Sequence, residues 1–387
     1  MKSNQPRRLS HKPTVVVYSF ETANEACAVI RIFGPLLAIG WNVVWASSKD
    51  SSGFKFDIEV AHSADLILIQ RMFPSKFTEK ILDFALTLGV PIVFDLDDSF
   101  FDVPPHLAIY HSSKKHIPYI KWILKSADLI TVSTAPLKTS LSRYTSRPIH
   151  VIPNILDFEL FSSSPREHKQ RFNFLVSGTN SHQKDWAIVE EPINRILELY
   201  GEKVSVTFFG DTPEKLKNHP CINIINFQCD YEKYASLLKK MDIHTALTPL
   251  EDTKYNHCKS NIKWLEYSAA GIPGIYSDLS PYNTCIQNDI TGILVKNTPD
   301  AWFNAMNSLI SDTEKRLRIA KNAQKRVLEQ HSLASSLDIN TSVIKSFFGK
   351  KHKHTAMAFT PIIHYRLYDN INKLLDRHLY WRIKKNN

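Results

Sequence analysis

The sequence predicts an α/β protein built from two doubly wound parallel-sheet domains that face a cleft. A chain of 387 residues exceeds what one hydrophobic core usually serves, so two domains are expected. Apolar strand candidates alternate with helical segments in two successive series, as in parallel sheets covered on both faces. A polar stretch, residues 162–170, separates the two series and reads as a linker.

The first series defines an N-terminal domain at residues 14–161. It opens with a β-branched run from Thr14 to Ser19, and apolar residues at helical spacing follow at 21–37. Further elements are expected in the same alternation: strands at 43–46, 66–69, 91–94, 129–132 and 149–153, and helices at 77–88 and 119–124.

The second series defines a C-terminal domain at residues 171–331. Its expected strands lie at 172–177, 204–208, 222–225, 243–246, 274–276 and 292–295. Its expected helices lie at 186–199, 231–239, 263–270, 301–310 and 315–329. Because ligands bind at the carboxyl ends of strands in open α/β sheets, we expect the functional site in the cleft between the domains.

The positive charge of the chain is concentrated at its two ends. The formal net charge is +10, of which the basic leader at residues 1–13 carries +4 and the tail at 350–387 carries +7, so residues 14–349 carry −1. A neutral body argues against a nucleic-acid partner. The tail combines a basic amphipathic pattern with Tyr380 and Trp381, which is typical of a helix lying on an anionic membrane surface. Residues 332–349 are expected to form a helix that returns to the N-terminal domain.

Cysteine usage and hydropathy indicate a cytoplasmic protein. The five cysteines include no Cys-x-x-Cys pair and fit reduced thiols. No apolar run approaches the roughly 18 residues that span a bilayer, and the polar N-terminus does not resemble a secretory signal. With the basic tail, this predicts a cytoplasmic protein attached peripherally to the inner face of the membrane.

The most informative stretch runs from Lys259 to Asp278. A helix beginning near Ser260 would present free N–H groups and its positive dipole end to an anion, and Lys259 and Lys263 would add charge suited to a diphosphate. Glu266 lies on roughly the same helical face and could accept two vicinal ribose hydroxyls. The alternative for these three residues is a solvated surface cluster.

This stretch resembles the nucleotide-sugar site of GT-B fold glycosyltransferases, Rossmann-like two-domain enzymes, close to the family 4 retaining group. Glu266 matches the second Glu of their Glu-x7-Glu motif, and Gly271 and Pro273 match the turn that follows. Cys258 stands where the first Glu would fall. However, Tyr255-Asn-His-Cys-Lys-Ser-Asn-Ile-Lys263, which includes Asn256, resembles the variant Phe-Asn-x-x-Lys-Ser-x-x-Lys that lacks the first Glu.

Further segments extend the resemblance over residues 14–331. Val151 to Asn154, followed by Asp157, is similar to the Ile-Pro-Asn segment before the interdomain linker. The segment from Ser177 to Asp185 resembles the first strand-to-helix loop of the donor domain. The resemblance implies donor binding by four residues of this loop: Gly178, Thr179, His182 and Lys184. In the alternative reading, Asp185 caps the next helix and the others are solvated.

An acidic segment, Val93 to Ser99, supports two interpretations. It resembles the nucleophile motif of haloacid-dehalogenase phosphatases, with Asp95 as nucleophile and Asp97 as acid/base, although several strand-helix units precede it here. In the glycosyltransferase interpretation, Asp95, Asp97 and Asp98 face the cleft, where a carboxylate binds acceptor hydroxyls or meets the departing proton. His106 and His111 are alternative acceptor-side candidates. A loop merely capped by Asp side chains is the structural alternative.

The resemblance implies a retaining transfer of a sugar from a nucleotide diphosphate sugar to a hydroxyl of a saccharide or lipid-linked glycan, in cell-surface polysaccharide biosynthesis. No cofactor and no bound metal are expected. Lys259 and Lys263 would stabilise the diphosphate leaving group, with Asp97 and Asp98 as further catalytic candidates. A phosphatase, or a non-catalytic protein that binds a glycan or nucleotide, remains the alternative.

Overall fold

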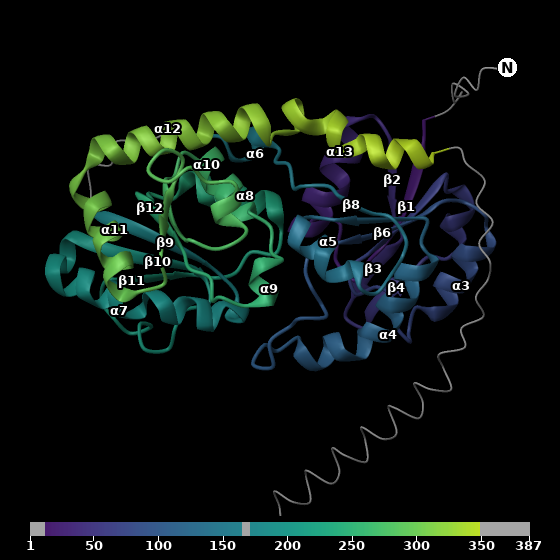
Figure 1. The fold of residues 1–387 in the computed structure, drawn as a ribbon, viewed down its shortest axis with the longest axis horizontal. Helices are drawn as coiled ribbons and strands as arrows, with labels where there is room; N and C mark the ends of the chain where they lie inside the picture. Colours follow the sequence, from purple (N-terminus) through teal and green to yellow (C-terminus); the bar gives the residue numbers. More distant parts are fainter. Residues whose placement is uncertain (1–11, 165–170, 349–387) are drawn as a thin grey trace, which may run out of the picture.

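The computed structural model describes residues 12–164 and 171–348, and these form two α/β domains side by side (Figure 1). The leader up to residue 11, residues 165–170 of the expected linker, and the tail from residue 349 lie outside the described residues. The expected class, two doubly wound domains with parallel sheets, is confirmed.

The sheet of the N-terminal domain has six parallel strands. In spatial order they are β2 (Asn42–Trp45), β1 (Thr14–Tyr18), β5 (Leu66–Gln70), β6 (Ile92–Leu96), β7 (Leu129–Val132) and β8 (Ile149–Val151). Every residue of β5, β6 and β7 is buried, because helices cover both faces of the sheet.

Helices of the N-terminal domain follow the expected alternation. They are α1 (Ala26–Ala28), the π-helical turn η1 (Val29–Phe33), α2 (Gly34–Ala38), the 3-10 turn η2 (Glu59–Ser63), α3 (Glu79–Thr87), α4 (Tyr110–Ser126), α5 (Ala135–Ser142) and α6 (Phe158–Phe161). Helix α4 is much longer than the six residues expected at 119–124, since its polar first half carries no apolar periodicity. An antiparallel hairpin, β3 (Ser47–Asp50) with β4 (Gly53–Phe56), was not expected, because β3 is polar and largely exposed.

The sheet of the C-terminal domain repeats this plan. Its six parallel strands, in spatial order, are β11 (Ile222–Ile225), β10 (Val204–Gly210), β9 (Phe172–Gly178), β12 (Thr245–Thr248), β13 (Gly274–Ser277) and β14 (Ile293–Val295). Its helices are η3 (Asn180–His182), α7 (Gln183–Tyr200), η4 (Gly201–Lys203), α8 (Tyr231–Lys240), α9 (Lys254–His257), α10 (Ile262–Ala269), η5 (Tyr282–Thr284), α11 (Pro299–Ser311) and α12 (Thr313–Gln330).

The last two described helices connect the domains along one side of the molecule. Figure 1 shows α12 over the C-terminal domain and α13 (Leu333–Phe347) continuing over the N-terminal domain. Helix α13 packs against α2, and the ring centroids of Trp41 and Phe348 lie 5.0 Å apart. Helix α13 therefore lies against the N-terminal domain.

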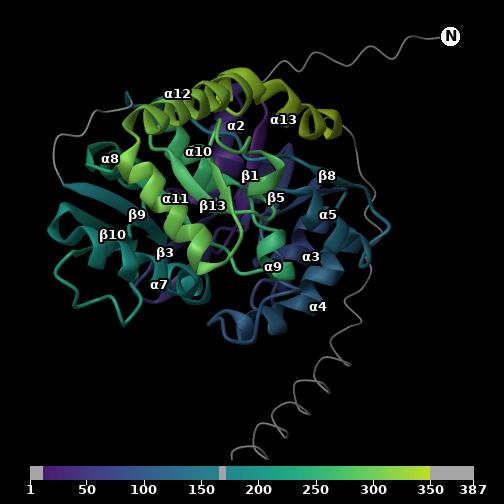
Figure 2. The same ribbon diagram turned by 60° about the vertical axis from the view of Figure 1, so that its left-hand side comes forward.

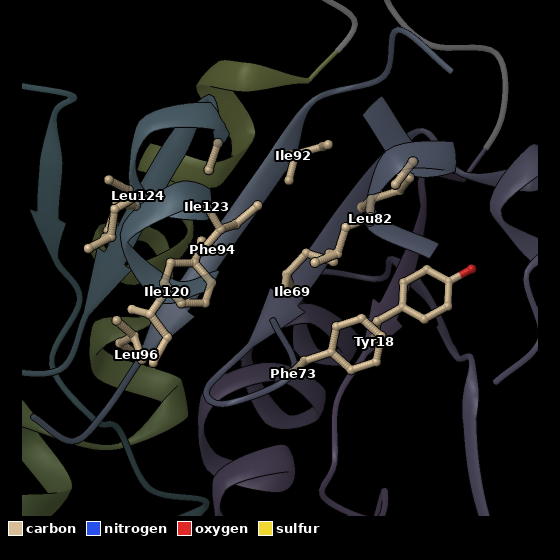
Figure 3. Packing of buried hydrophobic residues seen from close by; sticks show 14 of the residues in the cluster. Tyr18, Ile69, Phe73, Leu82, Ile92, Phe94, Leu96, Ile120, Ile123 and Leu124 are labelled. Carbon is tan, nitrogen blue, oxygen red and sulfur yellow. The ribbon is translucent and has the colours of Figure 1, made fainter. Parts of the chain in front are cut away.

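The N-terminal core lies between β-sheet and helices, as Figure 3 shows for ten labelled side chains. Phe94 of β6 and Ile120 and Ile123 of α4 are at most 1% exposed. Helix α9 lies at the domain boundary in both ribbon views (Figures 1 and 2), and its Tyr255 packs with Val103 and Leu107 of the other domain. Apolar contact therefore helps to hold the two domains together.

Two glycines let the ends of β9 and β10 meet closely. Gly210 pairs with Gly178 across the parallel ladder, and a Cβ on Gly210 would lie 2.0 Å from the carbonyl oxygen of Gly178. The φ angle of Gly210 is +115°, which side chains rarely permit. A side chain at residue 210 would therefore displace the loop that follows β9.

Replacing Gly210 by Ala should destabilise the protein more than replacing Gly53, whose φ is also +115° but whose Cβ would meet nothing within 4 Å. Gly53→Ala should cost about 1–3 kcal/mol from backbone strain alone. Gly210→Ala should cost about 2 kcal/mol more, because the backbone must also move away from the new methyl group. Urea unfolding monitored by circular dichroism measures both; equal costs would contradict the close approach.

Candidate functional site

A cavity of about 200 Å³ lies between the domains, at the carboxyl ends of β6 and β9. Both domains line it with charged and polar side chains: Cys27, Arg31, Arg71, Asp97, Asp98 and Asn154 from the first, and His182, Lys259, Ser260, Lys263 and Glu266 from the second. The cleft expected from the fold therefore exists, and six of the donor-binding and catalytic candidates named from the sequence line it: Asp97, Asp98, His182, Lys259, Lys263 and Glu266.

The two lysines differ in their surroundings. Burial opposes the charge of Lys259, but Asp98, whose Oδ1 lies 3.8 Å from its Nζ, outweighs this and the pKa of Lys259 is raised. Lys263 donates from Nζ to the carbonyl oxygen of Ser177, at the end of β9. Burial, assisted by the charge of Lys259, lowers the pKa of Lys263 to about 8. An anion in the cavity would reverse this shift.

Helix α10 begins at Ile262 rather than near Ser260, with Asn261 at the N-cap position. Lys259 therefore precedes the helix, whereas Lys263 and Glu266 lie on it one turn apart. Glu266 is 5% exposed, and burial raises the pKa of its carboxyl to about 7. Its two oxygens accept hydrogen bonds from Tyr231 and Tyr234.

His182 is held by Asp185 at the edge of the cavity. Its Nδ1 lies 2.7 Å from Oδ2 of Asp185, and its ring lies where a Cβ on Gly178 would fall. Burial, together with the charge of Lys263, lowers the pKa of His182 to about 4. The ring is therefore neutral near pH 7, which suits contact with a hydroxyl better than with a phosphate.

Asp185 has a larger role than the helix cap that the sequence suggested. It is 4% exposed, and its Oδ1 accepts hydrogen bonds from the backbone N–H of Glu251, at 2.7 Å, and from Nδ2 of Asn256, at 2.9 Å. It thus joins the loop after β9 to the segment before Lys259. The sequence places an Asp directly before the helix expected at 186–199, which indicates a cap and gives no signal for this role.

Several donor-side candidates do not line the cavity. Asn256 is buried and holds Asp185, Thr179 bonds Ser181, and Gly178 forms the close strand contact described above. Lys184 is exposed on the first turn of α7. The acceptor-side candidates His106 and His111 are also exposed and outside the cavity lining, and His111 lies in α4 rather than in a loop.

Asp97 and Asp98 line the cavity directly after β6, where Arg71 holds both. Arg71 Nη1 lies 2.5 Å from Asp97, and its Nη2 lies 3.6 Å from Asp98. Arg71 also pairs with Glu21 at 3.2 Å and has a positive φ of 55°. Sequence reasoning missed Arg71, because a single Arg after a strand carries no motif.

Asp95 differs from the sequence expectation, which placed it at the cleft. It is 4% exposed within β6, its Oδ1 lies 2.6 Å from Nη2 of Arg31, and Thr131 donates to it at 2.6 Å. Arg31 also donates to Asn154 Oδ1 at 3.1 Å. Asp95 lies within β6, whereas Asp97 follows the end of the strand, and the carboxylate of Asp95 binds Arg31, which itself lines the cavity.

Polar contacts join the domains beside the cavity. Asn154 Nδ2 donates to Ser260 Oγ at 3.0 Å, and Thr134 Oγ1 donates to the carbonyl oxygen of Cys258 at 2.9 Å. Cys258 itself is 4% exposed and packs with the core of the N-terminal domain. The residue that replaces the first motif Glu is therefore an apolar interdomain contact.

Within residues 12–164 and 171–348, no three His, Cys, Asp or Glu side chains are grouped as a metal ion would require. The expectation that the protein works without a bound metal stays a prediction.

Comparison with protein families gives one match. Residues 191–338 match the family model described as "Glycosyl transferase-like". This segment includes Lys259, Lys263 and Glu266. No curated protein sequence matches the chain.

Solved structures resemble the chain over most of its length. HepE from Anabaena, in complex with UDP-glucose, has a TM-score of 0.63 and 15% identity, covering 87% of this chain and 100% of that chain. Sucrose-phosphate synthase from Thermosynechococcus elongatus has a TM-score of 0.61 and 14% identity, covering 87% and 99%. TarM from S. aureus, with fondaparinux, alpha-GlcNAc-glycerol and UDP, has a TM-score of 0.57 and 11% identity, covering 76% and 59%. At these identities the likeness establishes the fold.

Removing the Asp95 carboxylate should strongly destabilise the protein. Asp95→Ala leaves the buried Arg31 guanidinium without its anion, which should lower the free energy of unfolding by about 3–5 kcal/mol. Asp50→Ala, which breaks the exposed pair with Lys55, is the control and should change stability little. Urea denaturation measures both, and an Asp95→Ala variant as stable as the control would contradict a structural role.

Proposed function

We propose a donor and an acceptor class for this chain, which is a glycosyltransferase with the GT-B fold and carries a glycosyl transferase-like domain over residues 191–338. It transfers a sugar from a nucleotide diphosphate sugar to a hydroxyl of a saccharide or lipid-linked glycan. The observation that carries this proposal is the grouping of Lys259, Lys263 and Glu266 on the C-terminal wall of one interdomain cavity.

The two lysines are suited to the diphosphate. Both line the cavity, and the pKa of Lys263, lowered to about 8 by burial, indicates a cation without enough nearby negative charge. A diphosphate supplies that charge, and the lysines stabilise it further as it departs and its charge increases. HepE has been solved with UDP and with UDP-glucose, which supports a nucleotide sugar as the donor here.

The acceptor hydroxyl is assigned to Asp97 and Asp98, on the opposite wall of the cavity. Carboxylates accept hydrogen bonds from hydroxyl groups and can orient one for attack. TarM has been solved with alpha-GlcNAc-glycerol and UDP, which supports a saccharide acceptor in this fold. The role in cell-surface polysaccharide biosynthesis remains part of the proposal.

Retention of the anomeric configuration fits the position of Asp98. Its carboxylate lies 3.8 Å from Lys259, the cation assigned to the leaving diphosphate. A hydroxyl bound by Asp98 would therefore lie close to the leaving diphosphate, as attack from the side of the leaving group requires. Attack from that side retains the configuration, and a phosphate oxygen can take the proton of the hydroxyl.

The phosphatase alternative is disfavoured by the position of its nucleophile. Asp95 is buried in the ion pair with Arg31 and does not line the cavity, so it cannot reach a phosphate ester there. The non-catalytic alternative is tested by turnover, since release of sugar from any nucleotide sugar would exclude it.

Among the described residues, no helix combines the length and apolar character required to cross a bilayer. Peripheral attachment to the inner face of the membrane is assigned to the basic tail, residues 350–387, which lies outside the described residues. A lipid-linked acceptor would be found at such a surface.

Removing the charged groups of the C-terminal cavity wall should abolish sugar transfer and leave the protein folded. Lys259→Ala, Lys263→Ala and Glu266→Gln should each lower kcat/KM by at least about 100-fold, because each removes a group assigned to the nucleotide or its diphosphate. Lys184→Ala, an exposed lysine near the same loop, should retain activity. Sugar transfer or hydrolysis from UDP-, GDP- and ADP-sugars measures this, with circular dichroism to verify folding. Full activity in Lys259→Ala and Glu266→Gln would refute the assignment.

Deleting residues 350–387 should weaken binding to vesicles that contain an anionic lipid, because the deletion removes +7 of the net charge. Nucleotide binding should be unchanged, since the cavity lies wholly within the described residues. Vesicle sedimentation and thermal shift measure the two properties, and unchanged sedimentation would exclude the tail as the anchor.

A further inference from the structure

Two tyrosines hold the carboxylate of Glu266. Tyr231 Oη donates to Oε1 at 2.8 Å, and Tyr234 Oη donates to Oε2 at 3.0 Å. Glu266 and Tyr231 are at most 5% exposed. Each carboxylate oxygen has two lone pairs, so each tyrosine leaves one acceptor position on its oxygen. Glu266 lines the cavity, whereas neither tyrosine does.

The tyrosines are themselves rigidly placed. They occupy the first turn of α8, three residues apart, and therefore lie on one helical face. The Phe161 ring centroid lies 5.3 Å from that of Tyr231 and 6.1 Å from that of Tyr234, and Phe209 lies 5.2 Å from Tyr234. Close packing on several sides restricts each phenol to one rotamer.

The start of α8 is bound to the N-terminal domain. The backbone N–H of Tyr231 donates to the carbonyl oxygen of Asn24 at 2.9 Å. Asn24 Nδ2 donates to Asp230 Oδ2 at 3.0 Å, and Asp230 caps α8 by accepting from the N–H of Lys233 at 3.0 Å. The tyrosine pair is thus fixed by contacts from both domains.

We propose that Tyr231 and Tyr234 are positioning residues that set the affinity of Glu266 for the ribose of the donor nucleotide, although neither touches it. This inference rests on the proposed function of Glu266. The tyrosines fix the plane of the carboxylate and leave one lone pair on each oxygen toward the cavity. Two such acceptors on one carboxylate match the two hydroxyls of a vicinal diol.

The tyrosines also determine the pH range over which Glu266 can act. Burial raises the pKa of Glu266 to about 7, and the hydrogen bonds from Tyr231 and Tyr234 oppose that rise. The other titratable groups that face or couple to it are Lys263 and Tyr267 on α10 and Tyr282 on η5. The ionised carboxylate accepts from both hydroxyls, so affinity should fall as pH decreases through about 7. Loss of one tyrosine hydroxyl should move this midpoint to higher pH.

The test uses the full chain and six variants: Tyr231→Phe, Tyr234→Phe, Glu266→Gln, the two double variants that combine Glu266→Gln with either Tyr→Phe change, and the control Tyr276→Phe. Tyr276 is a matched control, because its hydroxyl is buried in the same domain with no hydrogen-bond partner among the described residues. UDP, GDP and ADP are screened by thermal shift. The tightest binder and its 2′-deoxy counterpart are then titrated against each protein from pH 5.5 to 9.

In the unmodified chain, the nucleotide should bind about tenfold more tightly than its 2′-deoxy form at pH 8. Tyr231→Phe and Tyr234→Phe should each reduce the preference over the 2′-deoxy form and raise the pH midpoint of affinity. Tyr276→Phe should leave the preference and the midpoint unchanged. In the Glu266→Gln background, either Tyr→Phe change should add little, because the group that they position has lost its charge.

The possible failures are distinguishable. Both Tyr→Phe variants could bind the nucleotide with an unchanged preference over the 2′-deoxy form and an unchanged pH midpoint of affinity. That result would overturn the positioning role and leave the proposed function intact. No binding of any of the three nucleotides to the unmodified chain would contradict the proposed function, and the positioning role with it. If Tyr276→Phe reduced the preference for the nucleotide over its 2′-deoxy form as much as the other two changes, the effect would be one of general packing. That result would also overturn the inference.

Discussion

The positive charge of Lys263, placed at the carboxyl end of β9, is the constraint on which the donor side depends. Its Nζ donates to the carbonyl oxygen of Ser177, and burial lowers its pKa to about 8. Around it, burial lowers the pKa of His182 to about 4 and raises the pKa of Glu266 to about 7. A cavity lined by a cation whose pKa is lowered by burial favours an anionic ligand at that cation.

Asp97 and Asp98 place negative charge on the N-terminal wall of the cavity, facing the two lysines. Arg71 holds the carboxylates of Asp97 and Asp98, and Asp98 also pairs with Lys259 at 3.8 Å. The buried Arg31–Asp95 pair anchors the base of this wall. Separate cationic and anionic walls suit a reaction in which one wall binds a diphosphate and the other binds the attacking hydroxyl.

Much of the fold was predictable because its strands are buried on both faces and read as short apolar runs. The expected strand at 129–132 and that at 222–225 coincide with β7 and β11. The β3–β4 hairpin and the first half of α4 were missed, since neither carries a periodic apolar signal. The cavity-lining residues Lys259, Lys263 and Glu266 were singled out by sequence because they lie within one contiguous motif, whereas Arg71 and Asp185 carry no such signal.

The sequence alone determined the two-domain α/β class, the cluster of charged residues from Lys259 to Glu266, and the concentration of charge at the two ends of the chain. These properties depend on local pattern and composition. Only the tertiary structure decided that Asp95 binds Arg31 while Asp97 and Asp98 line the cavity, and that tyrosines of α8 hold Glu266. Such roles depend on which side chains meet from distant segments, and local spacing does not specify those meetings.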